Sequence, residues 1–236
     1  LDPGDEVIVF SPYFPMYRTQ IELAGGVCVD VPTYASEDYA IDEARLRAAI
    51  TPRTKAIIFN NPTNPTGMAY GNDTLEMLAR VAKEYDLLIA ADEIYTTYLY
   101  EGDFHPLRTL PGMAERTITL NSFSKNFLMT GWRVGVIIAE PELLEVMNDI
   151  NGSLIYTAPS ISQRAAIHAL SMRREIREKY VTAYRDRIFY TADRIEKIPY
   201  LSLVRPKGTF YLFPGIEKTG LTDDEFCNVL LDKAHG

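Results

Sequence analysis

Short apolar runs alternate along the chain with segments whose apolar residues recur every three or four positions. The runs are flanked by polar, glycine or proline residues and occupy 6–10, 27–31, 55–59, 87–91, 117–120 and 134–139. They are apolar almost throughout rather than at every second position, which predicts strands buried on both faces of a mainly parallel sheet.

The segments between these runs predict helices. Their approximate ranges are 16–24, 43–50, 73–85, 141–148, 160–170 and 173–197. Asp42 stands at an N-cap position, and Pro141 stands at the first position of a predicted helix. Strands that alternate with helices in this way predict an α/β fold, with three α/β/α layers around the sheet.

The pattern of apolar and polar residues changes near residue 197. Pro199 ends the last long helix, and the stretch "LSLVRPKGTFYLFPGI" (201–216) predicts strands and a tight turn. We therefore expect a large domain at 1–197 and the beginning of a smaller α+β domain at 198–236. Leu1 leads directly into a turn and a strand, and Gly236 directly follows a helical pattern. The sequence is thus expected to be the central portion of a longer polypeptide, without its N-terminal part and with a truncated second domain.

Composition narrows the function classes. The chain has 236 residues, 47% apolar content, a net charge of −8 and a pI near 5.0. An acidic chain without a basic stripe is a poor partner for nucleic acid or an anionic membrane. No apolar run reaches the roughly 18 residues of a membrane span, and no signal peptide is evident, so we expect a cytoplasmic protein. His105, His168 and His235 lack metal-ligand spacing, and we expect no metal site.

Polar residues follow three of the predicted strands. "NNPTNPTG" (60–67) follows the strand at 55–59, "DEIY" (92–95) follows 87–91, and "NSFSK" (121–125) follows 117–120. Ligands of open α/β sheets bind at the carboxyl ends of the strands, so these segments are expected to meet at one edge.

The residue types at this edge indicate specific chemistry. Asp92 follows five apolar residues, and a desolvated carboxylate needs a cation or becomes protonated; its alternative role is an N-cap. Tyr95 lies three residues further along and is expected on the same face. Asn64 stands between two prolines, which leave its side-chain amide free to bind a ligand.

Lys125 lies in a loop with two hydroxyl residues, Ser122 and Ser124, and with Arg133 eight positions later. A lysine amine in a partly apolar site is a nucleophile that can form a Schiff base, although a solvated lysine is the commoner case. Hydroxyl groups with an arginine are a suitable cradle for a phosphate.

Pyridoxal 5′-phosphate is an aldehyde, a phosphate and a pyridine in one molecule, and it would use all of these residues. Lys125 would hold the aldehyde and Asp92 would pair with the ring nitrogen. The ring oxygen would accept from Tyr95 and Asn64, and the phosphate would bind Ser122 and Arg133. Asp92 would then gain the cation that it needs.

The sequence resembles the class I/II aminotransferases of the fold-type I pyridoxal-phosphate enzymes. The resemblance covers essentially the whole chain, through "NNPTNPTG" (60–67), "ADEIYTTYLY" (91–100), "NSFSKNFLMTGWRVG" (121–135) and "RPKGTFYLF" (205–213). It implies a ping-pong transfer of an amino group between an amino acid and a 2-oxo acid through a Schiff base at Lys125. Asp92 and Tyr95 are implied catalytic partners of this lysine.

Further roles follow only from the resemblance. Phe14 occupies the position of an aromatic residue that stacks on the cofactor ring, and Ser124 occupies a variable position beside the phosphate. The family is typically a homodimer with shared active sites, and the segment 152–160, with Tyr156, corresponds to a loop that crosses to the partner. That segment lacks an arginine for a side-chain carboxylate, so a dicarboxylic substrate is not supported.

Three alternatives remain at this stage. A carbon–sulfur β-lyase of the same fold would share every motif, and a non-catalytic pyridoxal-phosphate-binding regulator would share most of them. Ser122 and Lys125 also fit the S-x-x-K motif of serine acyl enzymes, and 218–220 spells K-T-G. In those enzymes the first motif opens a helix and the second lies on a strand. Here the first follows a strand and the second precedes a helix, which favours chance matches.

Overall fold

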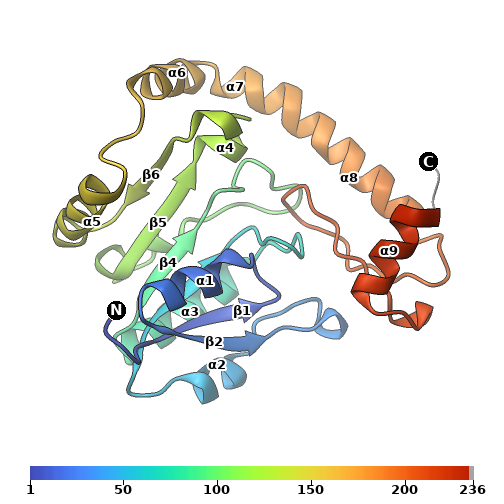
Figure 1. Cartoon of the computed structure of the whole chain (residues 1–236), viewed down its shortest axis with the longest axis horizontal. Helices are drawn as coiled ribbons and strands as arrows, with labels where there is room; N and C mark the ends of the chain where they lie inside the picture. Colours follow the sequence, from blue (N-terminus) through green and yellow to red (C-terminus); the bar gives the residue numbers. More distant parts are fainter. Residues whose placement is uncertain (234–236) are drawn as a thin grey trace.

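A single mixed sheet with the strand order β2-β1-β3-β4-β5-β6 organises the chain (Figure 1). The computed structural model describes residues 1–233, so residues 234–236 of the predicted second domain, among them His235 and Gly236, lie outside the described residues. The strands are β1 (Glu6–Ser11), β2 (Val27–Pro32), β3 (Thr54–Asn60), β4 (Leu88–Asp92), β5 (Thr117–Ser122) and β6 (Gly135–Ile138). The first five pair in parallel, and β6 runs antiparallel to β5.

The predicted helices are present, with changes at their ends. The α-helices are α1 (Met16–Leu23), α2 (Glu43–Ala49), α3 (Asn72–Glu84), α4 (Phe123–Asn126), α5 (Pro141–Leu154), α6 (Ser160–Ser171), α7 (Arg173–Ile176), α8 (Thr182–Ile195) and α9 (Asp223–Lys233). The predicted Asp42 cap is confirmed, because its carboxylate accepts the Arg45 amide at 2.7 Å. The helix predicted over 173–197 is divided by a π-helical turn, η5 (Arg177–Val181).

The three-layer arrangement follows from the two faces of the buried strands. On one face, Ile8 and Ile57 join a core with Leu46 of α2 and Leu78 of α3. On the other face, Val7 and Val9 pack with Tyr17 and Ile21 of α1. Because neighbouring residues of β1 point to opposite faces, an almost continuous apolar run lets helices cover both sides of the sheet.

Three expectations from the sequence are wrong in detail. Strand β6 is not buried on both faces: Val136, Ile137 and Ile138 are 44–47% exposed, because β6 is the edge strand beside β5. Helix α5 continues to Leu154, well beyond the predicted end near 148. The segment 201–216 forms isolated bridges rather than strands, one within the segment, from Ser202 to Gly215, and one to Leu99 from Gly208.

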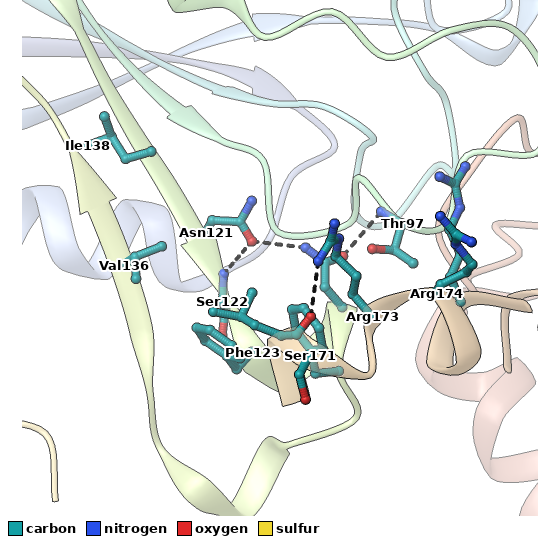
Figure 2. A pocket seen from close by; sticks show the side chains of 13 residues that line it. Thr97, Asn121, Ser122, Phe123, Val136, Ile138, Ser171, Arg173 and Arg174 are labelled. Carbon is teal, nitrogen blue, oxygen red and sulfur yellow. Dashed lines mark hydrogen bonds between the residues drawn. The ribbon is translucent and has the colours of Figure 1, made fainter. Parts of the chain in front are cut away.

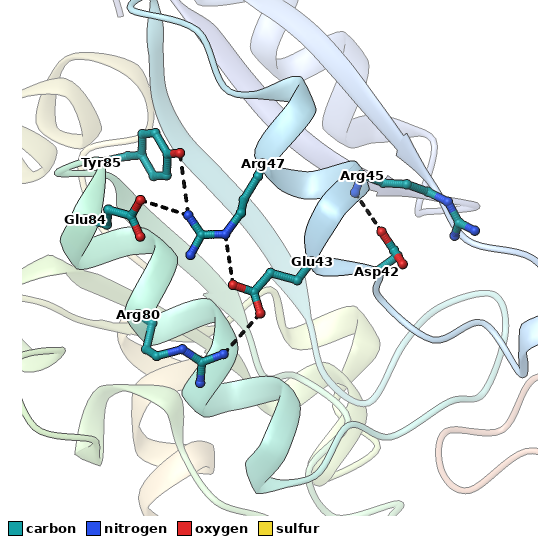
Figure 3. A network of polar contacts seen from close by, with 7 residues as sticks. All are labelled: Asp42, Glu43, Arg45, Arg47, Arg80, Glu84 and Tyr85. Atoms are coloured by element: carbon teal, nitrogen blue, oxygen red, sulfur yellow. Dashed lines mark hydrogen bonds and ion pairs between the residues drawn. The ribbon is translucent and has the colours of Figure 1, made fainter.

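A network of charged side chains joins α2 to α3 on the outer surface of the sheet's helical layer (Figure 3). Glu43 accepts from Arg47 at 2.9 Å and from Arg80 at 3.1 Å, and Arg47 also reaches Glu84 at 2.9 Å. These groups are partly exposed, so the network orients the two helices more than it stabilises them. It lies away from the polar strand ends.

Helices α7 and α8, with η5 between them, form a long rod that leads from α6 to the C-terminal segment (Figure 1). Among the described residues, no helix combines the length and apolar character that crossing a membrane requires.

Candidate active site

The three polar strand ends predicted from the sequence lie side by side. In the register of the sheet, Asn60 at the end of β3 pairs with Asp92 at the end of β4, and Asp92 pairs with Leu120 of β5. The Asn60 amide donates to the Asp92 carbonyl at 2.9 Å, which ties the first two ends together. The expected convergence at one carboxyl edge is therefore confirmed.

Asp92 is a buried carboxylate, 8% exposed, at this edge. Its Oδ2 accepts a hydrogen bond from the Tyr17 hydroxyl of α1, and its Oδ1 accepts the Ile94 amide at 3.3 Å. Burial raises the pKa of Asp92, and these two hydrogen bonds oppose that rise. Within residues 1–233 no lysine, arginine or histidine forms an ion pair with it.

Tyr95 lies beneath the same edge and is almost fully buried. Its hydroxyl is 3.0 Å from the hydroxyl of Tyr211, which comes from the segment after α8. Burial is the main cause that raises the pKa of Tyr95, and a hydrogen bond with the Asn64 side chain opposes it. The structure thus brings Asn64 and Tyr95 together, as the sequence predicts, and adds Tyr211.

Lys125 lies on the short helix α4 and is half-buried among aromatic rings. Its Nζ is 6.0 Å from the ring centroid of Tyr95 and 5.6 Å from that of Phe210. The Tyr98 hydroxyl donates to the Lys125 carbonyl at 3.1 Å and holds the backbone from below. The amine therefore faces an aromatic wall, and no carboxylate of the described residues pairs with it.

The segment 206–211 forms that wall by close backbone packing. The Gly208 amide donates to the Gly67 carbonyl at 2.9 Å, and the Thr209 amide donates to the Tyr98 carbonyl at 2.7 Å. A Cβ on Gly208 would lie 2.8 Å from the Tyr98 carbonyl oxygen. Glycine at position 208 thus allows the close packing that brings Phe210 to Lys125 and Tyr211 to Tyr95.

Ser122 and Ser124 meet within the turn that carries the lysine. The Ser122 hydroxyl accepts the Ser124 amide at 3.1 Å and caps α4. The S-x-x-K motif follows the end of β5, as expected, but it also opens the four-residue helix α4, which the sequence did not predict. The K-T-G motif lies in a 3₁₀ turn, η6 (Glu217–Thr219), as expected, and not on a strand.

A cavity of about 820 Å³ opens beside Ser122 (Figure 2). Asn121 and Ser122 line it from β5, and Arg173, Arg174 and Arg177 line it from α7 and η5. Lys125, Asp92 and Tyr95 do not line this cavity. It thus gives Ser122 a cationic neighbourhood but is not the site of the lysine.

Arg133 follows the turn η4 (Thr130–Trp132) in a left-handed conformation, with φ of 51°. Its guanidinium donates to the Thr130 carbonyl at 2.8 Å, and its side chain is exposed. Among the described residues Arg133 makes no hydrogen bond to Ser122 or Ser124, and a phosphate cradle built from these residues stays a prediction.

Phe14 and Tyr156 lie further out. Phe14 is 39% exposed and packs edge-on against Tyr17 at a centroid distance of 5.6 Å. Because Tyr17 is hydrogen-bonded to Asp92, Phe14 lies one residue away from that carboxylate. Tyr156 is 82% exposed just after α5.

The comparisons with known proteins agree with this geometry. The family model "Aminotransferase class I and II" matches residues 1–236. The chain belongs to this family. The aspartate/prephenate aminotransferase of Thermus thermophilus is 42% identical over 216 residues, which are 90% of this chain and 55% of that protein. The aromatic-amino-acid aminotransferase 2 of Thermococcus litoralis is 38% identical, over 99% of this chain and 61% of that protein.

A solved aminotransferase structure shares the fold described above. The aspartate aminotransferase from Thermus thermophilus with maleate superposes with a TM-score of 0.94 at 38% identity, covering 98% of this chain and 61% of that one. The predicted fold type I architecture is thereby confirmed. The chain spans about three fifths of the length of such aminotransferases.

Sequence reasoning missed three residues of this site. Tyr17 reaches Asp92 from a helix 75 positions earlier. From beyond α8, Phe210 reaches the lysine and Tyr211 reaches Tyr95. Both residues lie in the string "RPKGTFYLF", which carries the family resemblance but does not by itself indicate these contacts. Nothing local to Tyr17 distinguishes it from a core aromatic residue.

Proposed function

We propose that the protein is a pyridoxal-phosphate-dependent aminotransferase that moves an amino group between an amino acid and a 2-oxo acid by a ping-pong mechanism. One observation carries the proposal: two unpartnered groups occur at the same carboxyl edge. The Lys125 amine faces Tyr95 and Phe210, and the buried Asp92 has no cationic partner among the described residues. Membership of the aminotransferase family supplies the reaction class.

The donor set fits the cofactor. A buried carboxylate is costly without a cation, and a protonated pyridine nitrogen would provide one beside Asp92. Tyr95, with Asn64 beside it, offers a hydroxyl donor for the ring oxygen. Pyridoxal phosphate, when bound, supplies an aldehyde that condenses with amines and a ring that accepts electrons from the substrate α-carbon.

The phosphate would be held at the other end of the lysine turn. Ser122, Ser124 and Arg133 belong to the same short stretch, and the cationic wall at Arg173 favours an anion near Ser122. Phe14 would stack on the ring. Each of these residues would contribute hydrogen-bond donors or a flat apolar surface.

Lys125 does the proton chemistry of the proposed reaction. With the cofactor bound, the free amine would remove the proton from the substrate α-carbon and would deliver a proton to the cofactor's C4′ atom. The rings of Tyr95 and Phe210 limit where this amine can move and direct it toward the carboxyl edge of the sheet. A positioned base of this kind contributes about 10²–10⁴-fold to rate.

The substrates and the assembly are part of the same proposal. Relatives are named for aspartate, prephenate, aromatic amino acids and asparagine, so the family does not single out one substrate. We propose a cytoplasmic homodimer with shared sites, and a division into a large domain at 1–197 and a small one from 198. Exposed apolar residues support an interface along α5 and α6: Val146, Ile150, Leu154, Ile161 and Ile167.

The test is borohydride reduction of the purified intact protein after incubation with pyridoxal phosphate. We expect one reduced adduct, mapped by peptide mass spectrometry to Lys125, and loss of transamination in Lys125→Ala. Lys55→Ala is the control, because Lys55 is exposed and pairs only loosely with Asp5 at 4.0 Å. An adduct at another lysine, or full turnover in Lys125→Ala, would contradict the proposal. Release of pyruvate and ammonia from cystathionine without a 2-oxo acid would indicate the β-lyase instead.

A further inference from the structure

Tyr17 and Asp92 form a buried pair that joins helix α1 to the end of β4. The phenol donates to Asp92 Oδ2, and both side chains are at most 8% exposed. Tyr17 lies on the face of α1 that packs, with Ile21, against Val7 and Val9 of the sheet. The phenol is therefore held by the core on one side and by the carboxylate on the other.

Tyr17 is the side chain that donates to this carboxylate within the described part of the chain. The remaining donor is the Ile94 amide, at 3.3 Å from Oδ1. The Asp92 backbone carbonyl is occupied separately, by the Asn60 side chain at 2.9 Å and by the Asn61 amide at 3.1 Å. These backbone contacts fix the end of the strand, whereas the rotation of the carboxylate is set by Tyr17 at Oδ2 and by the long contact with the Ile94 amide at Oδ1.

Neighbouring aromatic rings fix the phenol in turn. Tyr13 stacks on Tyr17 at a centroid distance of 6.3 Å, and Phe14 meets it edge-on at 5.6 Å. Tyr13 directs its own hydroxyl elsewhere, 3.2 Å from the Arg18 Nε and 3.8 Å from the Cys28 sulfur. The two tyrosines thus share a packing environment and differ in whether they touch Asp92.

We propose that Tyr17 is a positioning residue that fixes one oxygen of Asp92 so that the carboxylate is presented to the cofactor's ring nitrogen. The inference rests on the proposed cofactor and extends it to a residue outside the motifs. A donor to a charged carboxylate contributes more than a neutral hydrogen bond, and it also limits the rotamers of the acid. Removal of the phenol oxygen should weaken the binding of a cofactor that has a ring nitrogen to pair with Asp92. It should leave the binding of a cofactor without that nitrogen unchanged.

The test compares two cofactors in the intact apoprotein. Dissociation constants are measured for pyridoxal phosphate and for its 1-deaza analogue, in which carbon replaces the ring nitrogen. We expect Tyr17→Phe to raise the dissociation constant of pyridoxal phosphate at least 5-fold and to change that of the analogue less than 2-fold. Tyr13→Phe, the matched control, should change neither. Equal weakening of both cofactors, or no weakening of either, would overturn the role of Tyr17.

Tyr17→Phe leaves the buried Asp92 carboxylate without its side-chain donor and could therefore disturb folding. A second comparison, in protein that carries Asp92→Asn, separates that effect from cofactor binding. In Asp92→Asn protein, which lacks that charge, adding Tyr17→Phe should change the affinity for pyridoxal phosphate less than 2-fold; a 5-fold change there would overturn the proposal. If the unmodified protein binds pyridoxal phosphate but these ratios fail, only the role of Tyr17 falls. If it does not bind pyridoxal phosphate at all, the proposed function falls with it.

Discussion

The hydroxyl oxygens of Tyr95 and Tyr211 lie 3.0 Å apart, although 116 positions separate the two residues in the chain. Tyr95 directly follows β4, whereas Tyr211 belongs to the segment beyond α8. Their hydrogen bond, with the rings at 5.7 Å and nearly perpendicular, connects the two parts of the chain at the proposed cofactor site.

This pair predicts a moderate catalytic effect at Tyr211. If Tyr95 donates to the cofactor, Tyr211 can donate to Tyr95 and orient its hydroxyl. Tyr211→Phe should then lower kcat about 2- to 10-fold, which corresponds to a hydrogen bond of roughly 0.5–1.5 kcal/mol. Steady-state kinetics of the intact protein measure it, with Tyr200→Phe as control because Tyr200 is 63% exposed. An unchanged kcat in Tyr211→Phe beside a reduced kcat in Tyr95→Phe would argue against the orienting role.

The close packing around Gly208 predicts that an alanine at this position lowers the free energy of unfolding. A Cβ there would meet the Tyr98 carbonyl oxygen at 2.8 Å and Pro62 at 2.9 Å, so Gly208→Ala should destabilise the protein by about 1–3 kcal/mol through overpacking. Urea unfolding measures this free energy. Gly152→Ala is the control: Gly152 lies in α5 with open space around its Cα, and alanine there should stabilise by up to about 1 kcal/mol. Equal free energies of unfolding for the two variants would contradict the packing argument.

The proposed contact of Arg133 with the cofactor phosphate predicts that its removal weakens cofactor binding. A charged hydrogen bond to a phosphate contributes about 1.5–3 kcal/mol, so Arg133→Ala should raise the Kd for pyridoxal phosphate about 10- to 100-fold. Fluorescence titration of the apoprotein measures it. Arg185→Ala serves as the comparison, since Arg185 is exposed and pairs with Asp186 at 3.5 Å. If both variants bind alike, the phosphate is held by other groups.

Glu93 predicts a pH dependence of stability. It is 5% exposed, and burial raises its pKa from 4.5 to about 7, against the opposing Leu107 amide. The folded protein therefore holds a proton that the unfolded chain releases above pH 4.5. Stability from this group is fully present below pH 4.5 and is lost as the pH rises to about 7.

The loss amounts to at most about 3 kcal/mol, because one pKa unit corresponds to about 1.36 kcal/mol. Glu93→Gln, which stays neutral, should remove this part of the decline. Urea unfolding of both proteins between pH 4.5 and pH 8 tests it. Parallel stability curves for the two proteins would show that Glu93 does not titrate in this range.

Much of the fold was predictable because its signals are local. Apolar runs without alternation specify strands that are covered on both sides, and the cap at Asp42 specifies the start of α2. The prediction failed at β6 and at 201–216. Strand β6 has the apolar character of its neighbours but lies at the edge of the sheet, and 201–216 is held by contacts to residues far away in sequence.

The family, the polar residues expected at the carboxyl edge and the candidate roles of Lys125, Asp92, Asn64 and Tyr95 all follow from local sequence patterns. These residues are recognisable because each directly follows a buried strand or lies in a motif of fixed spacing. The contacts of Tyr17, Phe210 and Tyr211 with this candidate site are visible only in three dimensions. Hydrogen bonds and ring contacts depend on distances in space, and between residues 75 or 116 positions apart those distances are set by packing of the whole sheet and its helices.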